Sequence, residues 1–392
     1  MKKRIAFVVQ RYGEQIAGGA EYHCRVLAEH LTSRYEVDVI TTCSISYTPW
    51  DNYFKEGVEE KNNVTIHRFS VEKIRDTFRM RSLTAELETE KENAESEWIA
   101  ELGPYCPGLI EYLKDNWQRY AAIIFFTYAY YPTVEGMKNK FPNAILLPTA
   151  HDEPQIYKSL YRKMFKLARA ILFNSIEERK FLCRNFLDEK IISRTTCCGI
   201  DIPNEKQLGI PERFNIENNY VLYIGRVGGG KNYSQLNKYF LEYKYRNPSD
   251  LKLVVAGKFD EGIKVTHSKD IIYTGFVSDE ERTALLQNAL FLINPSIYES
   301  LSLVILESMA VGKPILVNGQ CEVMKGQCIR SNAGLYYENF FEFEGAMLYM
   351  LNDKVAYNEM CSNGLEFVKR NYSWEFVVEN VSSLIEEVAL NE

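Results

Sequence analysis

Short runs rich in β-branched and aromatic residues alternate with helical patterns along the whole chain, in two successive series. In residues 21–31, for example, Val26, Leu27 and Leu31 share one helical face. Alternation of this kind is typical of parallel sheets built from βαβ units, so the chain is predicted to be an α/β protein with two sheets. The predicted strands are residues 5–9, 37–41, 65–69, 122–127, 144–148 and 170–174, then residues 220–225, 251–256, 271–274, 291–294 and 314–317.

The length of the chain also favours two domains, because 392 residues exceed what one ordinary core holds. The join is expected in the polar, Pro- and Gly-bearing segment 201–211. The predicted domains are therefore residues 1–203 and residues 204–372. Residues 72–118 lack the strand-helix rhythm and are predicted to be a helical elaboration of the first domain, with the acid-rich stretch 86–101 as a solvated helix.

Composition excludes several functions. A net charge of −7 argues against general nucleic-acid binding, which calls for a basic surface. Nine cysteines without a C-x-x-C pair are typical of reduced thiols and not of a disulfide or zinc framework. No apolar run approaches the roughly 18 residues that a membrane span needs, and the N-terminus is read as a first strand and not as a signal peptide. The sequence therefore predicts a cytoplasmic protein.

The stretch G-R-V-G-G-G-K-N, residues 225–232, has the G-x-x-x-x-G-K spacing of a phosphate-binding P-loop. A P-loop places Ser or Thr directly after the lysine to ligate magnesium, and this chain has Asn232 there. Arg226 and Lys231 would together be able to neutralise a diphosphate without a metal. A glycine turn with two solvated cations is the alternative.

Two further elements of the first half lie where open α/β sheets bind ligands. Gly18 and Gly19 follow the first strand and open a helix, where small residues let backbone amides approach an anion. His151 lies in the segment that follows the predicted strand at residues 144–148 and is one of five histidines. Either feature also has an ordinary structural interpretation, a turn for conformational reasons or a hydrogen-bonding histidine.

Residues 293–317 carry the densest signal. A strand ends near Asn294, and a helix is predicted to start near Ser302 and to stop at Gly312. Glu299 then lies in the loop and Glu307 in the second helical turn, close to a helix N-terminus whose amides favour anions. Two carboxylates beside such an anion site need hydrogen-bond donors, and the hydroxyls of a sugar would supply them.

Taken together, these motifs resemble the family 4 glycosyltransferases, retaining enzymes with a pair of glutamates that are separated by seven intervening residues. The resemblance covers almost the full length of the chain. It implies the GT-B architecture, in which two Rossmann-like domains with parallel sheets face each other across a cleft. The last helix, residues 373–392, would cross back to the first domain. The matching positions are Gly18-Gly19, His151-Asp152, Ser175 with Glu177 to Arg179, Gly199 to Asp201, Gly225-Arg226, Lys231-Asn232, Ala256-Gly257, Gly275 to Ser278, Pro295-Ser296, Glu299 to Glu307 and Gly334 to Tyr336.

The resemblance also implies a role for each site residue. Glu307 would bind the ribose of a UDP- or GDP-linked sugar, and Glu299 the sugar hydroxyls. Arg226 and Lys231, helped by the amides of Ser300, Leu301, Ser302 and Leu303, would stabilise the departing diphosphate. Gly18 and Gly19 would approach the same phosphates, Val277 would border the base, and His151 would contact the sugar. The catalytic residues would be Glu299, Arg226, Lys231 and His151.

The implied reaction is hexosyl or related transfer to a glycan or lipid-linked acceptor in polysaccharide or glycoconjugate biosynthesis. No D-x-D triplet occurs, so no metal or other cofactor is expected. The family usually has glycines after the first glutamate, where this chain has Ser300, Leu301 and Ser302. A catalytically inactive GT-B sugar-nucleotide-binding protein therefore stays an alternative, as does a nucleotide-dependent P-loop protein. A basic helix around Lys158 to Arg169 would suit peripheral contact with the inner membrane surface, or would be an ordinary charged exterior.

Overall fold

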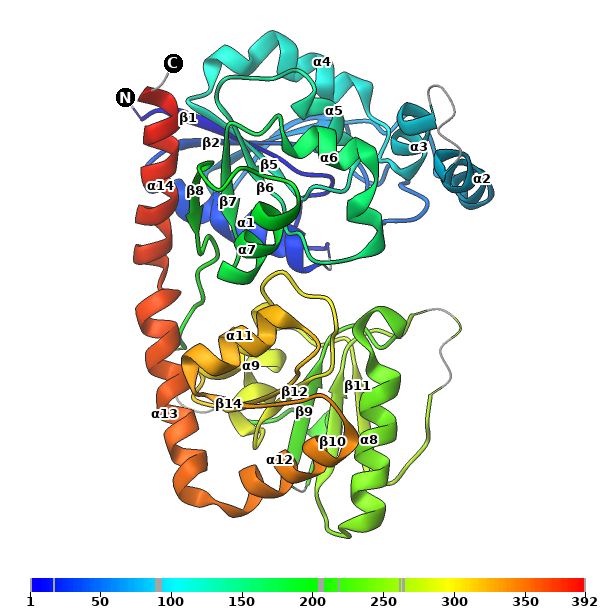
Figure 1. The fold of residues 1–392 in the computed structure, drawn as a ribbon, viewed down its shortest axis with the longest axis vertical. Coiled ribbons are helices and arrows are strands. Elements are labelled where there is room, and N and C mark those ends of the chain that lie inside the picture. The colour runs from blue at the N-terminus through cyan, green and yellow to red at the C-terminus, as the bar shows by residue number, and fades with distance from the viewer. Residues whose placement is uncertain are drawn as a thin grey trace. The chain divides into compact units, whose positions relative to one another are not determined.

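The computed structural model describes residues 2–16, 18–88, 94–203, 208–217, 219–260, 262 and 265–390. The chain divides into two compact units, which are described separately (Figure 1). Unit 1 comprises Met1–Gly199 with Trp374–Glu392, and unit 2 comprises Ile200–Ser373. Residues 204–207 of the expected join lie outside the described residues.

Unit 1 contains an eight-stranded sheet in the order β3-β4-β2-β1-β5-β6-β7-β8. Neighbouring strands pair in parallel, except that β3 is antiparallel to β4. This order places β1 at the centre, where both faces of a strand are buried. The strands are β1 (Arg4–Val8), β2 (Glu36–Thr42), β3 (Gly57–Lys61), β4 (Val64–Phe69), β5 (Ala122–Phe126), β6 (Ala144–Leu147), β7 (Ala170–Phe173) and β8 (Ile192–Thr195).

Helices cover both faces of this sheet, so successive residues of a strand belong to different cores. In β1, Ala6 and Val8 join one hydrophobic cluster, whereas Ile5 and Phe7 join the other. The long C-terminal helix α14 lines the second cluster. The helices of unit 1 are α1 (Gly19–Leu31), α2 (Thr77–Glu88), α3 (Ala94–Leu102), α4 (Pro107–Asn116), η1 (Trp117–Arg119), α5 (Tyr131–Met137), η2 (Pro154–Tyr157), α6 (Ser159–Phe165), α7 (Ile176–Asn185) and α14 (Trp374–Leu390).

Helix α14 is fixed in unit 1 by apolar packing and by a ring stack. Val377, Val381 and Leu384 are fully buried in the second cluster. Trp374 stacks on His30 with ring centroids 3.6 Å apart. A Cβ at Gly199 would lie 2.3 Å from the Trp374 ring, so only glycine fits beside it.

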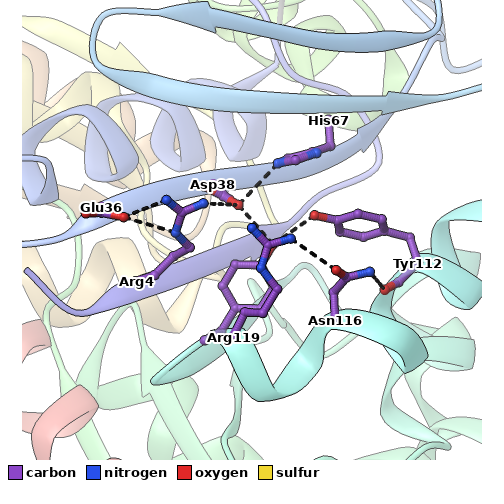
Figure 2. A network of polar contacts seen from close by, with 8 residues as sticks. Arg4, Glu36, Asp38, His67, Tyr112, Asn116 and Arg119 are labelled. Carbon is purple, nitrogen blue, oxygen red and sulfur yellow. Dashed lines mark hydrogen bonds and ion pairs between the residues drawn. The ribbon is translucent and has the colours of Figure 1, made fainter.

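A polar network ties β1, β2 and β4 together, away from the carboxyl ends of β1 and β2 (Figure 2). The buried Asp38 of β2 accepts hydrogen bonds from His67 Nε2 at 3.1 Å and from Tyr120 Oη at 2.9 Å, and Arg4 lies 3.6 Å away. Burial alone would raise the pKa of Asp38, but these partners hold it below its ordinary value. The network joins segments distant in sequence and is structural.

Unit 2 contains a six-stranded parallel sheet in the order β11-β10-β9-β12-β13-β14. Two parallel α/β sheets with flanking helices confirm the predicted fold class. The strands are β9 (Tyr220–Ile224), β10 (Lys252–Ala256), β11 (Ile271–Gly275), β12 (Leu292–Asn294), β13 (Ile315–Asn318) and β14 (Gly334–Tyr337). The helices are η3 (Glu212–Phe214), η4 (Gly229–Lys231), α8 (Tyr233–Arg246), α9 (Asp279–Asn288), α10 (Leu303–Ala310), α11 (Glu322–Ser331), α12 (Phe340–Asn352) and α13 (Lys354–Asn371).

The acid-rich segment 86–101 differs from the single solvated helix that the sequence predicts. Helix α2 ends at Glu88 and α3 begins at Ala94, while residues 89–93 lie outside the described residues. Trp98 and Glu101 of α3 are buried, and Glu101 accepts a hydrogen bond from Lys73. The prediction of a solvated helix was therefore wrong for this part of the segment, because one of its acids is buried with an internal partner.

Among the helices that the structure describes, none is long and apolar enough to cross a membrane.

Candidate functional site

Three glycines stack at the carboxyl edge of the unit 2 sheet, where β9, β10 and β11 end. Gly225, Gly257 and Gly275 all have positive φ angles, of 154°, 152° and 71°. The Gly225 amide donates to the Ala256 carbonyl at 2.9 Å, and the Gly257 amide donates to the Gly275 carbonyl at 2.8 Å. A Cβ at Gly257 would lie 1.8 Å from the Gly225 oxygen. Glycine is therefore required for these loops to approach one another.

The loop after β9 presents two cations at this edge. The Arg226 side chain is 67% exposed, and its NH1 lies 3.9 Å from Asp260 Oδ1. Lys231 is 31% exposed and donates from Nζ to Glu299 Oε1 at 2.7 Å. The structure thus brings together Lys231 and Glu299, which are far apart in sequence. It leaves the Arg226 guanidinium largely in solvent, where an anionic ligand can reach it.

Asn232 has a structural role at the position where a P-loop has its magnesium ligand. Its backbone is left-handed, with a φ angle of 54°, and it precedes α8. Its side-chain Nδ2 donates to the Pro295 carbonyl at 3.1 Å and to Gln235 Oε1 at 2.9 Å. Asn318 Nδ2 donates to the same carbonyl at 3.1 Å. The amides therefore hold the loop after β9 against the loop that leads to Glu299.

Helix α10 begins at Leu303, as predicted, but Ser302 does not cap it with its side chain. Ser302 has a φ angle of 62°, a conformation that L-residues seldom adopt. Its hydroxyl accepts a hydrogen bond from Asn294 Nδ2 at 2.9 Å instead. The first-turn amides of α10 therefore receive no hydroxyl cap from Ser302, and amides at such a helix end are the groups that bind anions. Ser302 therefore occupies the N-cap position, as its place near the predicted helix start implies, but its hydroxyl does not cap the helix.

Glu307 lies on α10, and its side chain is 17% exposed. Its Oε1 lies 3.3 Å from the NH2 atom of Arg282 on α9. Burial is the largest cause that raises the pKa of Glu307; the charges of Asp279 and Asp201 raise it further, and Arg282 lowers it. The sequence analysis missed Arg282. Arg282 lies only four residues after Ser278, so the sequence presents it as an ordinary residue near the start of a helix. The spacing of residues does not show that α9 faces α10.

The loop after β11 presents an aromatic ring beside Val277. Phe276 is exposed, and Lys258 Nζ lies 4.9 Å from its ring centroid. Val277 itself is half-buried. Ser278 and Glu281 then form a reciprocal capping box that starts α9. A flat ring at a sheet edge is suited to stack on another planar group.

In unit 1, the glycine pair opens α1 next to a buried carboxylate. Oε1 of Glu21 accepts hydrogen bonds from Gln10, from Arg11 and from Tyr47, at 2.7 to 3.1 Å. A Cβ at Gly18 would lie 2.2 Å from Glu21 Oε2, whereas a Cβ at Gly19 would meet nothing within 4 Å. A side chain at position 18 would thus collide with the Glu21 carboxylate, whereas a Cβ at position 19 would point into open space.

His151 follows β6 in unit 1, and its loop is anchored by two acids. Its Nε2 lies 3.4 Å from Glu153 Oε2, and Tyr128 donates to the other Glu153 oxygen at 2.5 Å. The buried Glu178 carboxylate accepts from the Ala150 amide at 2.5 Å. Burial raises the pKa of Glu178 to about 8. The predicted site residues are therefore divided: His151, Gly18 and Gly19 lie in unit 1, and the others lie in unit 2.

The family model described as "Glycosyl transferases group 1" matches residues 206–366, which cover the whole unit 2 site. The uncharacterized glycosyltransferase MJ1607 of Methanocaldococcus jannaschii is 22% identical over 95% of each chain. The chain is therefore similar to group 1 glycosyltransferases, and both matches support a transferase.

The fold has many solved counterparts. Sucrose-phosphate synthase from Thermosynechococcus elongatus superposes with a TM-score of 0.71 and 18% identity over 100% of both chains. Anabaena HepE, solved with UDP and glucose, superposes with a TM-score of 0.69 and 12% identity over 98% of this chain and 100% of its own. At these identities the likeness shows the fold, two Rossmann-like domains of the GT-B type.

Proposed function

We propose that this protein is a retaining family 4 glycosyltransferase that moves a sugar from a UDP- or GDP-linked donor to a glycan or lipid-linked acceptor. The donor is bound at the carboxyl edge of the unit 2 sheet. The observation that carries the proposal is the pairing of Lys231 with Glu299 beside the start of α10, inside the segment that matches the family model. A cation for phosphate and an acceptor for hydroxyls lie side by side there.

Charge stabilisation at the leaving group drives the reaction in this proposal. The C1–O bond of the donor breaks, and negative charge develops on the diphosphate. Arg226, Lys231 and the first-turn amides of α10 are oriented before that charge appears, which is the arrangement that lowers a barrier most. The acceptor oxygen bonds to C1 from the same face, and its proton passes to the departing phosphate. No metal takes part, because the two side-chain cations supply the positive charge.

Each carboxylate has a distinct task. Glu299 holds Lys231 Nζ in place at 2.7 Å and accepts from hydroxyls of the donor sugar. Glu307 accepts from the ribose hydroxyls, and Val277 borders the base. The roles of Gly18, Gly19 and His151 stay predictions from the family resemblance.

The second candidate function is a GT-B sugar-nucleotide-binding protein without catalysis. It is favoured by the left-handed backbone of Ser302, a serine where the family usually has glycine near the sugar. Such a protein would bind the donor and leave it intact.

Donor turnover separates the two functions. The full chain is incubated in EDTA with a panel of UDP- and GDP-hexoses, and ¹H NMR follows the released sugar, with water as the acceptor. A transferase of the proposed kind releases sugar whose first-formed anomer has the configuration of the donor. Binding without release would support the inactive protein, and release of the opposite anomer would rule out the retaining mechanism.

Contact with the inner membrane surface is a separate part of the proposal and rests on α6 and the turn after it. Arg162, Lys163, Lys166 and Arg169 are exposed, but Lys163 pairs with Glu95 at 2.8 Å. The protein would then act in the cytoplasm as a peripheral enzyme of polysaccharide or glycoconjugate biosynthesis. Sedimentation with anionic vesicles at low and moderate salt tests this contact, and an absence of salt-sensitive binding would rule it out.

A further inference from the structure

Arg282 joins the two helices that flank the proposed ribose site. It lies on α9, and its NH2 atom is 3.3 Å from Glu307 Oε1 on α10. The same atom is 3.3 Å from Asp279 Oδ1, one turn earlier on α9. Asp279 therefore pairs with the Arg282 guanidinium within α9, and the same guanidinium pairs with Glu307 across the interface between α9 and α10.

The surroundings of Glu307 make this contact important. Burial, Asp279 and Asp201 all raise the pKa of Glu307, and only Arg282 among the described influences lowers it. In a protonated carboxyl, one oxygen carries the proton and acts as a hydrogen-bond donor. Two vicinal hydroxyls are bound best by an ionised carboxylate, which accepts hydrogen bonds from both. A cation on one oxygen also restricts rotation of the carboxylate, because a planar guanidinium fixes the direction of the hydrogen bond.

We propose that Arg282 is a positioning residue that orients the Glu307 carboxylate for the ribose hydroxyls of a nucleoside diphosphate. This inference rests on the proposed donor site in unit 2. Arg282 occupies Oε1 from the α9 side, and the second oxygen of Glu307 accepts from the ribose. The residue acts through Glu307 and not on the base or the phosphates, so its effect is largest for nucleotides that carry both ribose hydroxyls.

The test compares ribonucleotide and 2′-deoxyribonucleotide binding by titration calorimetry. The full chain and its R282L variant are titrated with UDP and 2′-deoxy-UDP, and with GDP and 2′-deoxy-GDP, in EDTA. For the base that the wild type prefers, we expect R282L to weaken ribonucleotide binding by about tenfold, on the scale of one charge-assisted contact. We expect the same change to weaken 2′-deoxynucleotide binding clearly less, because only the 3′-hydroxyl remains for Glu307, so that R282L discriminates less between the two sugars.

Two further variants separate positioning from a general loss of charge or structure. R213L is the matched control, because it likewise removes one positive charge next to α9. In the wild type, Arg213 pairs with Glu281 of α9 at 2.6 Å. R213L should leave the ratio of the two affinities unchanged. R282K retains the charge without the planar fork and should lie between the wild type and R282L. It also serves as the variant to test if R282L does not fold.

An equal loss of affinity for both sugars in R282L, or an unchanged ratio, would overturn the role of Arg282. Tighter binding of the ribonucleotide in R282L would show instead that Arg282 competes with the ribose for Glu307. If the wild type binds neither ribonucleotide, the proposed donor site itself is wrong, and the role of Arg282 falls with it. If the wild type binds the ribonucleotide and only the R282L ratio fails to change, the donor site stands and this inference alone is refuted.

Discussion

The titratable groups at the carboxyl edges of the two sheets differ in their exposure to water. In unit 2, Arg226 is largely exposed beside the partly exposed Asp260, and Lys231 is partly exposed beside the largely buried Glu299. In unit 1, Glu21, Glu178 and His23 are buried, with partners from the protein itself. Both edges stand where α/β sheets bind ligands, so position alone does not distinguish a binding residue from a structural one.

The difference lies in what a charged group costs when it is removed from water. A buried titratable group needs internal partners, and once it has them it holds loops in place. A half-exposed cation keeps its capacity for an external anion. Variants at the unit 2 edge should therefore change function at nearly constant stability. Variants at the unit 1 edge should change stability first.

The largest expected effect is on turnover. K231A or R226A should lower donor turnover by about a hundredfold or more, because each removes charge that stabilises the leaving group. The midpoint of thermal unfolding should change little, since both side chains are partly or largely exposed. K238A on α8 is the matched control, an exposed lysine in the same unit. Near-normal turnover in both site variants would remove their assigned role.

His23 should make the stability of unit 1 depend on pH. Burial lowers the pKa of His23 to about 4, against an ordinary value near 6.5. Between these values the unfolded chain binds more protons, so the free energy of unfolding falls as the pH falls from 6.5 towards 4. H23Q, whose amide can still donate to the Cys197 carbonyl, removes this titration. Chemical denaturation of both proteins should show the wild type losing about 2 kcal/mol more than H23Q over this window. Parallel pH profiles would contradict the prediction.

The two glycines that open α1 provide the most local test. G18A should destabilise the protein by about 1 to 3 kcal/mol, because the new Cβ meets the buried Glu21 carboxylate. G19A should cost nothing or stabilise slightly, because its Cβ meets open space at a helical position. Urea unfolding of the pair gives the comparison. Equal effects would show that the Glu21 contact does not require Gly18.

The sequence predicted the fold well because buried parallel strands leave strong apolar runs. The runs at residues 5–9 and 251–256, for example, correspond to β1 and β10. It missed β3, β8 and β14 for physical reasons. Strand β3 is fully exposed and reads G-V-E-E-K, and β8 reads I-S-R-T with Ile192 as its one apolar residue, so neither carries a buried-strand pattern.

The features at the carboxyl edge of the unit 2 sheet are visible in the sequence, but their pairing is not. Glycines that end strands are visible in the sequence, and so is a carboxylate in a helix. That Lys231 meets Glu299, and that Arg282 meets Glu307, depends on strand order and on helix packing, which spacing does not specify. The conformation of Ser302 was equally hidden, because a serine before a helix normally caps it.

Thermal unfolding with excess UDP, GDP or ATP, each with magnesium and with EDTA, tests the central claim most directly. A nucleotide at about 100 times its dissociation constant should add about 2.7 kcal/mol to the free energy of unfolding. The proposed donor site predicts stabilisation by UDP or GDP that persists in EDTA and is much smaller for K231A. Stabilisation by ATP alone, and only with magnesium, would make residues 225–232 a P-loop and would contradict the account.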